Sequence, residues 1–113
     1  MFEQTEYTPD ELLISAPVTA RATIKTGVSF PARTPLMADA TDTATLVAWD
    51  GTAGKAIAIS ARDVTNTGSD QESTVYLQGG FRIGFVLWPE SVTTNKQKRA
   101  AFLGSPIFVD DEY

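Results

Sequence analysis

Short runs of apolar and β-branched residues, separated by turn residues, dominate the chain. Runs of this length and composition are typical of β-strands rather than helices. The segments at 45–49 and 55–60 flank an Asp-Gly turn, so we expect them to pair as a hairpin. The Gly79-Gly80 pair predicts a bend between two strands. In all, the pattern predicts strands or extended segments at residues 21–30, 34–37, 45–49, 55–60, 75–77, 81–88 and 106–109.

One helix is predicted near the C-terminal end. Thr93 or Thr94 can cap its first turn, residues 95–103 form its body, and Gly104 stands where a C-terminal glycine belongs. Residues 66–73 contain no apolar side chain and predict an exposed loop. Many short strands and one helix indicate a mostly β domain.

The first twenty residues do not follow this pattern. Their apolar patch, Leu12-Leu13-Ile14, is too short for a stable helix and is followed by Pro17. We therefore expect residues 1–20 to form a flexible arm and residues 21–113 to form one β-rich domain.

Charge separates the ends of the chain from its body. The chain has 113 residues and a net charge of −5, and seven of its 14 acidic residues lie within 1–20 and 105–113, which contain no Lys or Arg. Residues 21–104, the body of the chain, hold the other seven acidic residues and all nine basic residues, so the body is nearly neutral. Nucleic acid calls for a basic face, so we expect no such partner. No apolar run approaches the roughly 18 residues of a membrane span, the acidic start disfavours secretion, and the absence of cysteine suits a reducing cytoplasm.

The residue types give little support for catalysis. Histidine is absent, which removes the commonest general base and the commonest metal ligand. Asp39, Asp42 and Asp50 form the closest group of carboxylates and could be imagined as a calcium site or an acid–base pair. Asp beside Thr and Gly is, however, ordinary turn chemistry. We expect no enzyme, no metal and no cofactor.

The two tryptophans allow three interpretations. Trp49 and Trp88 each end an apolar segment beside a turn, and Pro89 follows the second. An indole there can bury its rings while its N–H reaches a backbone acceptor, so core packing comes first. A subunit interface comes second, because aromatic residues are enriched in interfaces. A platform that stacks on carbohydrate comes third.

Two blocks of the sequence resemble the head-decoration protein D family of lambda-like phages. They match it in order and spacing, and the resemblance covers about half of the chain, roughly residues 33–61 and 81–109. The residues that carry it are Thr34-Pro35-Leu36-Met37 with Leu46-Val47-Ala48-Trp49-Asp50-Gly51-Thr52, and Phe81-Arg82 with Val86-Leu87-Trp88-Pro89-Glu90, Lys98-Arg99-Ala100-Ala101-Phe102 and Gly104.

The resemblance implies a mostly β, single-domain, β-clip-like fold with one or two short helices. It also implies a homotrimer that binds the major capsid protein at threefold and quasi-threefold positions on the outside of the expanded head. There the protein would stabilise the virion against the pressure of packaged DNA, after assembly in the host cytoplasm. No membrane partner is implied.

The family's N-terminal arm becomes ordered on the shell, and the arm expected here has that character. An extended segment can pair with an exposed strand edge while its apolar side chains fill pockets. We expect Leu12, Leu13, Ile14, Pro17 and Val18 to make these contacts. Trp49, Trp88 and Pro89 are candidates for the core or the trimer interface. The alternative from another class is a small β-rich carbohydrate-binding or adhesin-like module that uses an exposed tryptophan.

Overall fold

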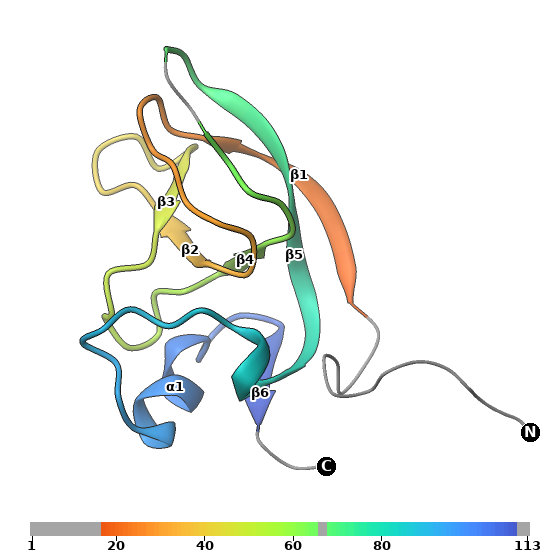
Figure 1. Ribbon diagram of the computed structural model, residues 1–113, viewed down its shortest axis with the longest axis vertical. Coiled ribbons are helices and arrows are strands. Elements are labelled where there is room, and N and C mark those ends of the chain that lie inside the picture. The colour runs from red at the N-terminus through yellow and green to blue at the C-terminus, as the bar shows by residue number, and fades with distance from the viewer. Residues whose placement is uncertain (1–16, 66–67, 111–113) are drawn as a thin grey trace, which may run out of the picture.

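Six strands and one short helix form the part of the chain that the computed structural model describes, residues 17–65 and 68–110 (Figure 1). The mostly β class expected from the sequence is confirmed. In chain order the elements are β1 (Val18–Ile24), β2 (Pro35–Ala38), β3 (Leu46–Ala48), β4 (Ala58–Ser60), β5 (Gln71–Arg82), the 3-10 turn η1 (Ile83–Phe85), α1 (Asn95–Ala101) and β6 (Ile107–Asp110).

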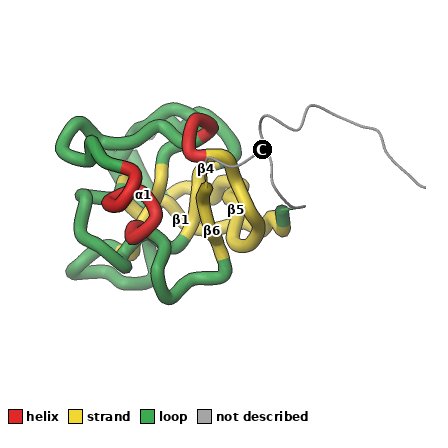
Figure 2. The backbone as a smooth tube through the Cα atoms, turned by 90° about the horizontal axis from the view of Figure 1, so that it is seen from below, coloured by secondary structure: helices red, strands yellow, loops and turns green. Residues whose placement is uncertain are grey.

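Five of these strands close into a small mixed barrel. Their order is β1-β3-β2-β4-β5, and β5 pairs back with β1 in antiparallel fashion from Val18 to Ile24. The contact between β1 and β3 is parallel and is limited to Ile24 and Leu46. β6 adds to β5 in parallel beyond the barrel, where β5 runs on past its pairing with β1. The long strand β5 therefore joins the barrel to the end of the molecule that carries β6 and α1 (Figure 1). Seen from below, β6 lies beside β5 (Figure 2).

The core has two parts, one inside the barrel and one at the end of the molecule that carries β6 and α1. The barrel interior is filled by aliphatic side chains and one phenylalanine: Ile24, Phe30, Leu36, Leu46, Ala58, Val64 and Val75. The second part lies under α1 and β6 and is richer in aromatic side chains: Trp49, Ala56, Ile59, Phe81, Ile83, Phe85, Val86, Val92, Ala101, Phe102, Ile107 and Val109. Apolar burial on this scale is the main force that holds so small a domain together.

The predicted helix is confirmed and ends two residues early. Thr94 is its N-cap, and a capping box joins the Thr94 side chain to the backbone N–H of Gln97 and the Gln97 side chain to the backbone of Thr94. This reciprocal pair satisfies donors that the first helical turn leaves free. The helix ends at Ala101, and Gly104 follows with a φ of 94°, a value that suits glycine.

The expected hairpin between residues 45–49 and 55–60 is wrong. β3 and β4 both pair with β2, which lies between them. The loop between β3 and β4 bonds to the helix instead: the N–H groups of Gly54 and Ala56 donate to the carbonyls of Ala100 and Ala101 in α1. Local alternation locates a strand but does not choose its partner.

The expected bend at Gly79-Gly80 is also wrong, because β5 continues through both glycines to Arg82. Pairing with β6 holds this stretch extended, with Gly79 opposite Ile107 and Gly80 opposite Phe108. At its other end β5 starts at Gln71, inside the loop expected at 66–73. Pairing with β1 orders those polar residues. The run at 81–88 is not one strand, since it turns at η1 directly after β5.

Candidate interaction surfaces

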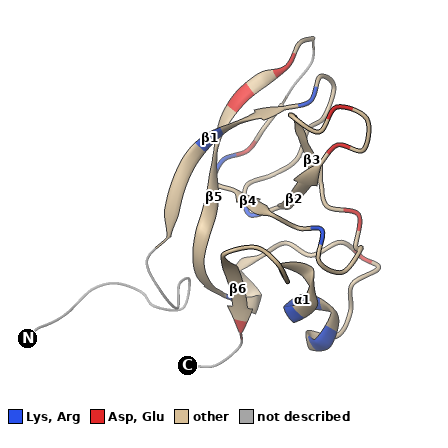
Figure 3. Cartoon of the chain, turned by 180° about the vertical axis from the view of Figure 1, so that it is seen from behind, with Lys and Arg blue, Asp and Glu red and all other residues tan. Residues whose placement is uncertain are grey.

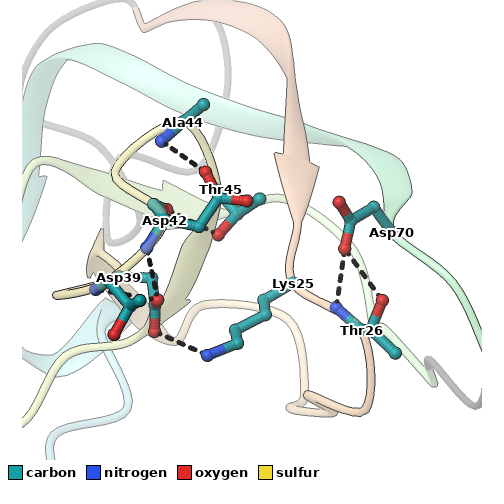
Figure 4. A network of polar contacts seen from close by, with 8 residues as sticks. Lys25, Thr26, Asp39, Asp42, Ala44, Thr45 and Asp70 are labelled. Carbon is teal, nitrogen blue, oxygen red and sulfur yellow. Dashed lines mark hydrogen bonds and ion pairs between the residues drawn. The ribbon is translucent and has the colours of Figure 1, made fainter.

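The three aspartates considered as a site belong to separate turns. One carboxylate oxygen of Asp39 accepts hydrogen bonds from the backbone N–H groups of Thr41 and Asp42, at 3.1 and 2.9 Å, and the other lies 3.1 Å from the Lys25 ammonium (Figure 4). The hydrogen bond from Asp42, followed by the contact with Lys25, lowers the pKa of Asp39 below its ordinary value.

Asp42 and Asp50 make similar local bonds. The Asp42 carboxylate accepts from the N–H of Ala44, and the Asp50 carboxylate accepts from the N–H of Thr52, which lowers the pKa of Asp50. Among residues 17–65 and 68–110, no three side chains of the metal-binding types cluster in a way that could hold an ion. The three aspartates thus stabilise turns, which is the role that their Thr and Gly neighbours indicate in the sequence.

Both tryptophans are engaged in the second core. Trp49 is buried, and its indole N–H donates to the carbonyl of Thr52 at 2.8 Å. Trp88 is half-buried, donates to the carbonyl of Ile83 at 2.9 Å, and packs edge-on against Trp49 and Phe102. Pro89 is half-buried beside it. Neither indole is fully exposed, whereas the carbohydrate-binding alternative required an exposed tryptophan.

Exposed apolar side chains gather at the end of the molecule that carries β6. The three most exposed large apolar residues of the described chain are Leu103, Phe108 and Val18, at 64%, 50% and 48% exposure. Leu103 and Phe108 line one surface hollow of about 410 Å³ between the end of α1 and β6. Val18 pairs with Gln78, two residues before the glycine that pairs with Phe108. We call Val18, Leu103 and Phe108 the terminal patch.

The chain matches a known protein family along most of its length. The family model of the bacteriophage lambda head decoration protein D matches residues 1–107. The chain belongs to this family. It is a phage structural protein of the capsid head surface, and not an enzyme.

Two phage proteins are similar to this decoration protein along most of its length. A protein of Escherichia phage N15, to which a decoration role is attributed, is 48% identical over 82 residues, which is 72% of this chain and 72% of its own. The head decoration protein of Enterobacteria phage P21 is 42% identical over 89 residues, 76% of this chain and 74% of its own.

The residues expected in the decoration protein's arm fall into two groups. Leu12, Leu13 and Ile14 lie outside the described residues. Pro17 is half-buried just before β1, and Val18 is the first residue of β1. The barrel therefore starts three residues before the boundary expected at residue 21. The sequence does not mark this start clearly, because the alternation of apolar and polar residues in β1 is short and the exposed Arg21 lies in its middle. No helix within the described ranges is long and apolar enough to span a bilayer.

Sequence reasoning missed Leu103 and Phe108. The signal for Phe108 was present, since Ile107, Phe108 and Val109 are consecutive apolar residues in a strand whose neighbours point to opposite faces. One of the two faces buries Ile107 and Val109, so the residue between them must point outward. Leu103 follows the last helical turn and carries no comparable pattern.

Proposed function

We propose that the protein binds as a homotrimer at threefold and quasi-threefold positions on the outside of the expanded head, and that it clamps the major capsid protein against the pressure of packaged DNA. Membership of the decoration family supports this role. Within it, we assign the fold to the β-clip type. Trp88 and Pro89, both half-buried, stay candidates for the trimer interface.

The arm is proposed as the main shell contact. The observation that supports this is the firm pairing of β1, whose first residue, Val18, is the root of the arm. β1 pairs with β5 along its whole length from Val18 onward, so a pull on the preceding residues is transmitted to the longest strand of the domain. The apolar segment Leu12-Leu13-Ile14 ends four residues before this root. Three such arms in a trimer bind multivalently, and modest affinity per arm then suffices.

Deleting residues 2–16 tests this role. The deletion spares β1, so we expect a native circular dichroism spectrum and unchanged urea unfolding. Burial of even two of the arm's apolar side chains is worth roughly 3–6 kcal/mol before ordering costs. Apparent affinity for expanded, undecorated capsids should therefore fall by at least about tenfold. Deletion of residues 111–113 is the matched control and should bind as the intact chain does. Equal decoration by the arm-less chain would contradict the clamp.

The trimer has its own test. Light scattering in solution and imaging of decorated capsids should give three copies per site, whether the trimer forms before binding or on the shell. A stable dimer in both measurements would contradict the threefold placement.

A further inference from the structure

The terminal patch contains a side chain that the fold holds in an exposed position. Within β6, alternation buries Ile107 and Val109 and turns Phe108 outward. The Phe108 ring lies directly on Gly80 of β5, since a Cβ built on that glycine would stand 2.2 Å from the ring. The ring therefore rests on backbone. An anchor fixed in this way loses little conformational freedom when a partner covers it.

The surroundings of Phe108 are apolar and electrically neutral. The adjoining hollow is lined by Phe102, Leu103 and Ile107, and its rim carries Arg99 and Asp110, which pair with each other at 3.3 Å. A phosphate or a strongly charged segment gains little from a rim whose charges are already paired. Large apolar side chains around a hollow instead favour an apolar segment as the occupant.

The position of the arm's root indicates where that segment comes from. The arm leaves the domain at Val18, which is itself a member of the patch. Extended chain spans at most about 3.6 Å per residue, so Ile14 lies within about 14 Å of Val18 wherever the arm binds. The shell surface that receives Ile14 must therefore lie within about 14 Å of Val18, the member of the patch to which the arm connects.

From these observations we propose that Val18, Leu103 and Phe108 form a second, arm-independent contact, which covers an apolar segment of the major capsid protein beside the arm's binding site. The inference rests on the proposed decoration function and adds a contact on the folded domain. The arm gains its affinity by becoming ordered, whereas the patch is preformed.

Serine substitutions test the patch. Leu103→Ser changes an exposed loop residue and leaves the core intact, and Phe108→Ser removes the ring from Gly80. The matched control is Ile57→Ser, which changes a 40% exposed residue that lines a different hollow beside Met37 and Lys55. Each chain is measured for urea unfolding, oligomeric state by light scattering, and apparent affinity for expanded, undecorated capsids.

We expect Leu103→Ser and Phe108→Ser each to weaken capsid binding at least fivefold with an unchanged oligomeric state, and Ile57→Ser to bind normally. The same loss should appear when Leu103→Ser is placed in the chain lacking residues 2–16. Unchanged affinity of both patch variants would overturn the inference. A patch variant that no longer forms trimers in solution but still binds capsids with normal affinity would also overturn it, and would make the patch a subunit contact. If the intact chain itself failed to bind capsids, the decoration function would fall and the patch inference with it.

Discussion

The two ends of the molecule differ in their surface side chains: one end has polar groups that bond within the chain, and the other exposes large apolar groups. At the end formed by the turns around Asp39, Asp42 and Asp70, polar groups are satisfied within the chain: Asp70 accepts from the backbone N–H and hydroxyl of Thr26, at 3.0 and 2.8 Å (Figure 4). Acidic residues are frequent there, while α1 carries basic residues at the other end (Figure 3). We call these the loop end and the terminal end.

The terminal end instead leaves large apolar side chains in water. A surface polar group that is hydrogen-bonded within the chain costs little, whereas exposed apolar surface is unfavourable and is stabilised when a partner covers it. The loop end is therefore built to hold itself together, and the terminal end is built to meet a partner. Substitutions should separate these two roles.

The largest effect is expected from a pair of phenylalanines six residues apart. Phe102 is buried against Trp88 in the second core, and Phe108 is half exposed. Phe102→Ala leaves a cavity, so we expect a loss of about 3–5 kcal/mol in the free energy of unfolding. Phe108→Ala should cost about 1 kcal/mol or less, because the ring is already half in water. Urea unfolding measures both. Equal losses would show that Phe108 belongs to the core and not to a surface.

A smaller effect is expected at the glycine beneath the exposed ring. In Gly80→Ala the new methyl group meets Phe108, so the ring must move or β5 and β6 must separate, at a cost of about 1–3 kcal/mol. The cost should largely vanish in a Phe108→Ala background, because the clash then has no second partner. Gly84→Ala is the control, since nothing lies near its added Cβ. If Gly80→Ala costs the same in both backgrounds, the ring does not rest on that backbone.

The helix cap should contribute less again. Thr94→Ala removes the side-chain oxygen that accepts from the Gln97 N–H, and N-caps of this kind are worth about 1 kcal/mol. Thr93→Ala is the neighbouring control, because only the Thr93 backbone N–H, which alanine keeps, bonds to Gln97. Chemical unfolding distinguishes the two variants. Similar stability of both would mean that α1 is held by packing alone.

The sequence was a good guide to elements whose causes are local. Thr94 and Gly104 predict the helix because each acts within a few residues of the helix end that it closes. Most strands were located for the same reason, since β-branched runs between turns need no distant information. The aspartates were correctly assigned to turns, because each bonds to backbone two or three residues away.

What depended on distant partners could not be predicted in this way. The placement of β2 between β3 and β4, and the continuation of β5 through Gly79-Gly80, follow from hydrogen bonds to segments far along the chain. The start of β1 at Val18 depends on its pairing with Gln78. The terminal patch was missed because its members are brought together by the same distant pairings.

The smallest effect is expected from acid, and it should act at the loop end. The pKa of Asp39 is lowered by the N–H of Asp42 and by Lys25, so its contribution to stability is fully present above the carboxyl's unfolded pKa, about 3.9. That contribution is lost as pH falls through the lower, folded pKa. Asp39→Asn should therefore be less stable than the parent at pH 6, and the difference should shrink as the pH falls below 4. Glu90→Gln removes the same charge from an exposed side chain and should leave stability at pH 6 unchanged. The measurement is the free energy of unfolding between pH 3 and pH 7, and a difference that stays constant over this range would show that the Asp39 carboxylate does not stabilise the loop end through its charge.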